Sequence, residues 1–302
     1  MRNSSNFLAW SLLLFLAITW GSSFILMKKA MFFDANQTVF SAMQVAAMRI
    51  VIAALVLLPF VHHKIIETIN NGLWKPIVVT GIFGNGIPAF LFTYAQTKID
   101  SSLAGMLNAL TPIFTVLIAF AIFKTRFTTL QIAGLSLAFL GAIGMLLFKE
   151  KQLDFENLEY GLLIVLATFF YGVSVNTIKN YLTHLKPVHA AGLAFNSVLI
   201  PALIVLLFSG ADEVFISNPH ALGSFGAIVL LAVVGTAFAV VLYNKLINIS
   251  SVIFASSVTY LIPIFALFWG WFFGESITWL RLSFMAVVLF GVFLINKKRL
   301  KI

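Results

Sequence analysis

The sequence contains no cysteine and very little charge. The absence of cysteine among its 302 residues excludes both a disulfide framework and a thiolate metal site. Charged residues make up 10% of the chain and hydrophobic residues 61%. A soluble domain typically carries about a quarter charged residues, so too few are present here to cover a surface that faces water. Most of the surface is therefore expected to face lipid.

Acidic residues are missing from the centre of every long apolar run, and the nearest is Glu275. A deep carboxylate is the usual proton or sodium relay of a coupled pump. Its absence favours a facilitator or an exchanger, and it leaves coupling through backbone carbonyls open.

Several catalytic signatures are also missing. The chain has no Gly-rich phosphate loop ending in Lys-Ser/Thr, no HExxH helix and no pair of intramembrane aspartates. We therefore expect neither an ATP-driven pump nor a membrane protease. The predicted protein is not an enzyme and needs no cofactor or metal.

Long apolar runs dominate the chain. A transmembrane helix needs about twenty mainly apolar residues, and a barrel strand only about ten. Lipid admits only helices or closed barrels, because backbone polar groups must be paired internally. Ten segments have the length of a helix: 8–27, 40–61, 76–96, 102–123, 129–148, 159–179, 189–208, 222–244, 252–273 and 279–296. The first is expected to be a retained helix, because no small-residue cleavage site follows it. The predicted fold class is an all-α membrane protein with ten transmembrane helices.

The basic residues gather in alternate loops. If both termini are cytoplasmic, 12 of the 19 Lys and Arg residues fall on the inside, 6 fall outside and Arg49 lies within a span. Cytoplasmic loops carry an excess of Lys and Arg, so this orientation is favoured. The net charge of +9 thus reports topology, and no nucleic-acid partner is expected. The predicted location is the cell membrane, taken as a bacterial inner membrane.

The two halves of the chain resemble each other. Residues 123–141 (FKTRFTTLQIAGLSLAFLG) match residues 273–291 (FGESITWLRLSFMAVVLFG) at four positions with an offset of 150. Each half holds five predicted helices, an odd number, so the second half enters the membrane from the opposite side. The predicted repeats are residues 1–153 and 154–302. Inverted repeats of this kind are typical of secondary transporters, whose substrate site lies near the midplane between them.

Polar side chains concentrate on the first, third, fourth, sixth, eighth and ninth helices. Polar groups at membrane depth usually face a bundle interior or a water-filled cavity, so these helices are predicted to surround a cavity. The alternative is that the same residues only join helices by hydrogen bonds, each contributing about 0.6 kcal/mol. The candidate substrate-binding residues are Trp20, Ser22, Arg49, Asn85, Tyr94, Asn108, Tyr171, Asn176, Tyr243 and Tyr260. The aromatic members would form walls, and the asparagines would hydrogen-bond the substrate.

Arg49 is the one clear ion deep in a span. An unpaired charge there costs at least ~2.5 kcal/mol. Arg49 is expected either to bind a substrate carboxylate or to brace its helix through backbone carbonyls and a polar neighbour.

Pro112 and Pro263 lie at matched places in the two halves. Proline kinks a helix by removing a backbone hydrogen bond, so both are hinge candidates. The alternative is that proline is simply more frequent in membrane helices.

The order of these features resembles the EamA-type transporters of the drug/metabolite transporter superfamily. The likeness is carried by WGSSF at 20–24, Arg49, LNALTPIFTVLIAF at 107–120 and VTYLIPIFALFWGWFFGESITW at 258–279. It implies ten helices in an inverted repeat, cytoplasmic termini, a central cavity and export of amino acids or other metabolites. The family's Gly-Glu-x-x-Thr signature is matched by Glu275, whereas the first half has Lys124 and Thr125 in its place.

The sequence thus predicts a secondary transporter that exports small metabolites, amino acids or related solutes, by alternating access. A small-molecule substrate and the lipid bilayer are the expected partners, and a monomer is the working expectation. The alternative is a membrane receptor or assembly protein without transport activity.

Overall fold

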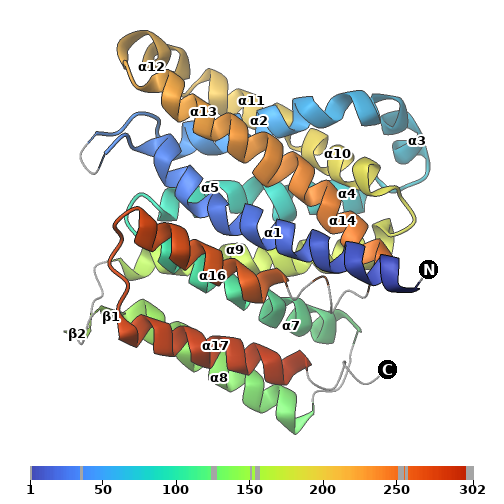
Figure 1. Cartoon of the computed structure of the whole chain (residues 1–302). Coiled ribbons are helices and arrows are strands. Elements are labelled where there is room, and N and C mark those ends of the chain that lie inside the picture. Colours follow the sequence, from blue (N-terminus) through green and yellow to red (C-terminus); the bar gives the residue numbers. More distant parts are fainter. Residues whose placement is uncertain are drawn as a thin grey trace.

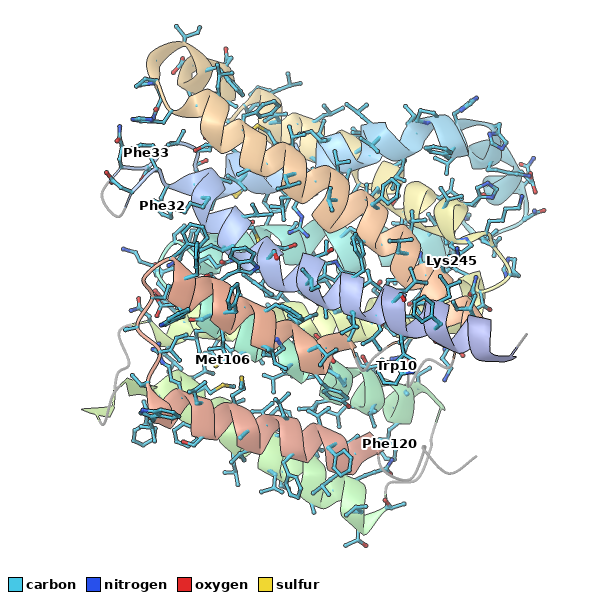
Figure 2. All side chains as sticks on the ribbon, in the orientation of Figure 1. Trp10, Phe32, Phe33, Met106, Phe120 and Lys245 are labelled. Carbon is cyan, nitrogen blue, oxygen red and sulfur yellow. The ribbon has the colours of Figure 1, made fainter. Side chains whose placement is uncertain are left out.

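The helices of the computed structural model run side by side through one elongated bundle (Figure 1). The structure describes residues 2–34, 37–123, 128–149, 152–153, 157–250, 255 and 258–296. Helix α1 (Arg2–Met31) begins at the end of the bundle where α17 (Trp279–Asn296) finishes. We call this the N-terminal end, and the opposite one the far end. Trp10 and Lys245 lie toward the N-terminal end, and Phe32 and Phe33 lie at the far end (Figure 2).

The remaining elements follow in chain order. They are α2 (Ala42–Val61), η1 (His62–Lys64), α3 (Ile65–Asn70), α4 (Trp74–Gly81), η2 (Ile82–Gly86), α5 (Ile87–Ala95), α6 (Ser101–Leu107), η3 (Asn108–Leu110), α7 (Thr111–Phe123), α8 (Thr129–Leu147), β1 (Phe148–Lys149), β2 (Gln152–Leu153), α9 (Leu158–Thr177), η4 (Ile178–Leu182), α10 (Pro187–Ser197), α11 (Leu199–Leu207), α12 (Ala211–Ser217), α13 (Ala221–Ala232), η5 (Val233–Phe238), α14 (Ala239–Ile249) and α16 (Val258–Phe272). The two-residue strands β1 and β2 pair antiparallel.

The predicted helical membrane class is confirmed. Within the described ranges, seven helices are long and apolar enough to cross a membrane, or eight if α10 and α11, bent by 42°, form one span. Helices α16 and α17 are shorter apolar helices. Each falls on one of the ten predicted segments, but ten crossings in two inverted halves remain a prediction. Asp154, Lys124 and Thr125 lie outside the described residues.

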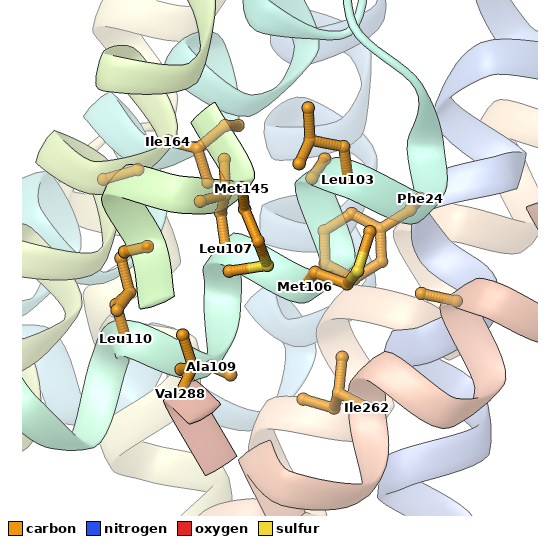
Figure 3. Close-up of a cluster of buried hydrophobic side chains, with 14 of the residues drawn as sticks. Phe24, Leu103, Met106, Leu107, Ala109, Leu110, Met145, Ile164, Ile262 and Val288 are labelled. Carbon is orange, nitrogen blue, oxygen red and sulfur yellow. The ribbon is translucent and has the colours of Figure 1, made fainter. Parts of the chain in front are cut away.

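The surface and the core are both apolar. Leu207, Phe208 and Trp279 are 77%, 88% and 87% exposed. Large apolar patches on a surface mark contact with something other than water, and here the length of the helices indicates lipid. Inside, α1, α6, α8 and α9 meet in a cluster of buried side chains that includes Phe24, Met106 and Ile164 (Figure 3).

Helices α8 and α17 lie side by side along one flank of the bundle, and their backbones touch (Figure 1). A Cβ atom on Gly134 would lie 2.5 Å from the carbonyl oxygen of Gly291, and one on Gly141 would lie 2.9 Å from that of Phe284. Small residues allow this close approach. The two halves align with a sequence offset of 150, so Gly134 corresponds to Phe284 and Gly141 to Gly291. The Gly141–Phe284 contact is therefore the Gly134–Gly291 contact with the two halves exchanged. Such an exchange is the signature of a two-fold relation between the helices.

Candidate functional site

A cavity of about 160 Å³ lies within the bundle. Its lining comes from α1, α2, η2 and its flanking helices, the α6–α7 segment, α9, α10, η5 with α14, and α16. Every helix that was predicted to surround a polar cavity contributes, and the second and seventh predicted helices contribute too. A cavity of this size takes a solute about as large as benzene.

Irregular helical turns supply much of the lining. Asn85 lies in the π-turn η2, Asn108 in the 3₁₀ turn η3 and Thr236 in the π-turn η5. A π-turn inserts one residue into a helix, and such turns occur frequently at functional sites. The backbone thus departs from the regular helix at the places where these three polar side chains meet the cavity.

Arg49 on α2 supplies the cavity's positive charge. Its Nε donates to the Thr236 hydroxyl at 2.7 Å, and its Nη1 contacts the Met27 sulfur at 3.7 Å. Thioether sulfur is only a weak acceptor. Among the described residues, no carboxylate forms an ion pair with Arg49. A guanidinium presents its donors in a planar fork that matches a carboxylate, and within the described part of the chain the partners of this fork are the Thr236 hydroxyl and the Met27 sulfur.

Aromatic rings form the walls beside Arg49. The rings of Trp20 and Tyr243 lie 5.1 Å apart, and the Trp20 indole donates to the Gly235 carbonyl at 3.2 Å. Phe92 and Tyr171 stack at 5.8 Å. Rings with one polar atom combine apolar contact area with a hydrogen-bonding handle, so the lining suits an amphipathic solute.

The structure brings six of the ten candidate binding residues to the cavity: Trp20, Arg49, Asn85, Asn108, Tyr171 and Tyr243. The other four lie elsewhere. Ser22 accepts from the Trp269 indole at 2.7 Å, and Tyr94 is half exposed beside Tyr160. Asn176 donates to the Thr115 and Gly172 carbonyls at 2.9 and 2.8 Å, and Tyr260 donates to the Val292 carbonyl at 3.4 Å. Each of these four contacts a neighbouring helix.

The two hinge candidates have different surroundings. Pro112 is the second residue of α7, which begins directly after the 3₁₀ turn η3, whereas Pro263 lies inside α16. Both belong to helices that line the cavity. Their role as hinges remains a prediction.

Several lining residues were not among the candidates. Met27, Thr80 and Ser174 line the cavity, and so does Thr236. On α1 the spacing offers a usable signal, because Trp20, Phe24 and Met27 follow the helical repeat of three to four residues, whereas Ser22 does not face the same side as Trp20.

Charged side chains tie several elements together at the far end. The Glu275 carboxylate accepts from the backbone N–H groups of Ser101 and Ser102 at 2.8 and 2.9 Å and from the Ser101 hydroxyl at 2.6 Å. It thereby caps α6 and places negative charge at the start of a helix, where the dipole favours it. Lys28 lies 3.9 Å from Glu275 and also 3.9 Å from Asp100.

This far-end cluster adjoins the cavity lining through α1, because Met27 lines the cavity. Lys28 directly follows Met27, which is only 2% exposed. Phe92, Ile99 and Leu103 are buried in the same apolar cluster as Met27. Apolar packing therefore surrounds Met27 between the cavity lining and the far-end cluster.

We expect Glu275→Gln to lower the free energy of unfolding by about 1.5–3 kcal/mol, the usual contribution of hydrogen bonds to a charged group. Burial alone would raise the pKa of Glu275, but its hydrogen bonds to Ser101 and Ser102 outweigh burial and hold the pKa below the usual value of a glutamate. A lowered pKa gives stability that is complete above the unfolded value and is lost as the pH falls through the folded value. The difference between wild type and variant should therefore be constant from neutral pH to about 5 and shrink below it.

Thermal unfolding in detergent across this pH range measures that difference. Glu213→Gln is the matched control, because Glu213 is exposed on α12. Equal stability losses in the two variants would contradict a specific cap at Glu275.

Comparisons with known proteins agree with the helical membrane fold described above. The EamA-like transporter family matches residues 8–147 and again residues 159–297. An uncharacterized transporter of Archaeoglobus fulgidus is 23% identical over 96% of this chain and 99% of its own length. An S-adenosylmethionine/S-adenosylhomocysteine transporter of Chlamydia muridarum is 26% identical over 86% of this chain and 82% of its own.

A protein of known crystal structure shares the fold with a TM-score of 0.64 and 14% identity over the whole of both chains. The two family matches together cover most of the 302 residues. The resemblance noted in the sequence is therefore confirmed, and the chain belongs to the EamA-like transporter family.

Proposed function

We propose that this chain is a secondary transporter for small metabolites that carry a carboxylate, such as amino acids and related solutes, and that it exports them across the cytoplasmic membrane. The observation that carries the proposal is the Arg49 guanidinium, which lines the central cavity with no acidic partner among the described residues. Buried charges are normally paired. A substrate carboxylate would supply the missing partner.

Alternating access follows from the proposed architecture. In this proposal the ten predicted segments all cross the membrane as two inverted halves. The reciprocal glycine contacts of α8 and α17 and the double family match support it. In the predicted orientation the N-terminal end lies in the cytoplasm and the far end faces outward. Rocking of the halves would then expose Arg49 to each side in turn.

The size of the cavity bears on the substrate. A volume of about 160 Å³ suits a compact amino acid better than a bulky adenosyl compound. The name of the chlamydial relative nevertheless makes S-adenosylhomocysteine worth testing. S-adenosylmethionine carries an additional positive charge, and the one charged group in the lining, Arg49, would repel it.

Flux into proteoliposomes tests the proposal. Purified protein would be given radiolabelled amino acids, S-adenosylhomocysteine and S-adenosylmethionine, with and without an imposed pH gradient. Saturable flux of carboxylates, absent from protein-free vesicles, is the expected result, and independence from the gradient would indicate facilitation. Binding of the same solutes by folded protein without any flux would favour a receptor instead.

A further inference from the structure

We propose that Thr236 is a positioning residue of the carboxylate site, which holds the plane of the Arg49 guanidinium so that its Nη groups face the cavity. This inference rests on the proposed function, in which Arg49 receives the carboxylate of the substrate. The two residues come from opposite halves of the chain, Arg49 from α2 and Thr236 from η5.

The hydrogen bonds of Thr236 fix its role as an acceptor toward Arg49. A hydroxyl has one proton to donate and lone pairs to accept with. The Thr236 hydroxyl donates to the Leu231 carbonyl at 2.8 Å and accepts from Arg49 Nε at 2.7 Å. Since its proton is already committed to a backbone carbonyl, the oxygen presents lone pairs to the guanidinium. Thr236 is only 4% exposed, so this contact is shielded from bulk water.

The backbone of η5 explains why the hydroxyl points this way. Threonine in a regular helix bonds a carbonyl three or four residues earlier, whereas Thr236 reaches back five residues, to Leu231. The π-turn makes this possible by adding one residue to the turn. Helix α1 holds the turn in place, because Trp20 donates to the Gly235 carbonyl and a Cβ on Gly235 would lie 2.8 Å from the Ser23 hydroxyl.

Orientation of the fork matters for selectivity. A planar guanidinium recognises a carboxylate through two parallel N–H bonds. Anchoring Nε to Thr236 leaves the Nη groups to make these bonds. Without the anchor, Arg49 keeps its charge but loses its fixed plane, so binding of a carboxylate should weaken while binding of a neutral amide does not change.

Acetate and acetamide provide a pair of probes that fit the cavity. They are similar in size, but acetate carries a charged carboxylate and acetamide a neutral amide. The full-length protein in detergent would carry ¹⁵N-arginine, with the Arg49 Nε signal assigned through Arg49→Lys. Binding of each probe would be followed at that signal in wild type, Thr236→Val and Thr236→Ser. Thr177→Val is the matched control, because the Thr177 hydroxyl donates only to the Val173 carbonyl at 2.9 Å and lies outside the cavity lining.

We expect Thr236→Val to weaken acetate binding about tenfold, the factor that a hydrogen bond to a charged group commonly contributes. Acetamide binding should not change, Thr236→Ser should restore the wild-type affinity for acetate, and Thr177→Val should behave as wild type. Acetate binding that survives Thr236→Val unaltered would overturn the positioning role alone. If acetate leaves the Arg49 signal of the wild type unmoved, the carboxylate site of the proposed function is itself overturned.

Discussion

Replacement of Arg49 by glutamine should abolish most carboxylate flux while leaving the protein folded. Loss of one partner from a desolvated, hydrogen-bonded charge pair costs about 2–5 kcal/mol, so flux at low substrate concentration should fall at least ~30-fold. Arg49→Lys keeps the charge without the planar fork and should retain only part of the flux. Initial rates in proteoliposomes measure both effects.

Although Arg49→Gln should reduce flux, it should not reduce the stability of the folded protein. A charge held in a span without an ionic partner costs at least ~2.5 kcal/mol, and among the described residues Arg49 forms hydrogen bonds with the Thr236 hydroxyl and the Met27 sulfur but no ion pair. The melting temperature of Arg49→Gln in detergent should therefore equal or exceed that of wild type. Binding sites often carry such a cost in stability. Loss of folded protein would instead assign Arg49 to bracing α2, the alternative that the sequence left open.

The helical segments could be predicted from the sequence because lipid imposes one simple requirement. Each span must be long, apolar and internally hydrogen-bonded. The length and the apolar character of a segment can both be read directly from the sequence. The helices that line the cavity were predictable for a related reason. Polar residues in a span cost free energy, so they are concentrated where they face a bundle interior or a cavity.

The exact faces of those helices could not be predicted, because they depend on turns that the pattern does not reveal. A π-turn adds a residue and rotates everything after it relative to a regular helix. In the part of the chain that the structure describes, three π-turns, η2, η4 and η5, contribute to the lining. Thr236 reaches Arg49 only through such a turn. Similarly, Asn176 resembles a cavity residue in the sequence, yet its amide donates to the Thr115 carbonyl of α7 and to the Gly172 carbonyl of its own helix.

Substitutions at the close contact between α8 and α17 should have the second large effect, a loss of folded protein. Gly134→Leu or Gly291→Leu should prevent the two helices from packing and remove most of the folded protein. The atoms facing an added Cβ at Gly291 are the Gly134 carbonyl oxygen at 2.5 Å and the Ala138 nitrogen at 2.7 Å. Both are backbone atoms, so neither can rotate away as a flexible side chain would.

Even the smaller change Gly291→Ala should lower the free energy of unfolding, by about 1–3 kcal/mol as for other overpacked sites. Gly226→Ala on α13 is the control, because a Cβ there meets nothing within 4 Å. An unstrained glycine-to-alanine change within a helix stabilises by up to ~1 kcal/mol, so the two alanine variants should shift the melting temperature in opposite directions. Thermal unfolding of both in the same detergent decides the matter. Equal shifts would mean that α8 and α17 do not pack as closely as described, and the reciprocal contacts that support two inverted halves would lose their basis.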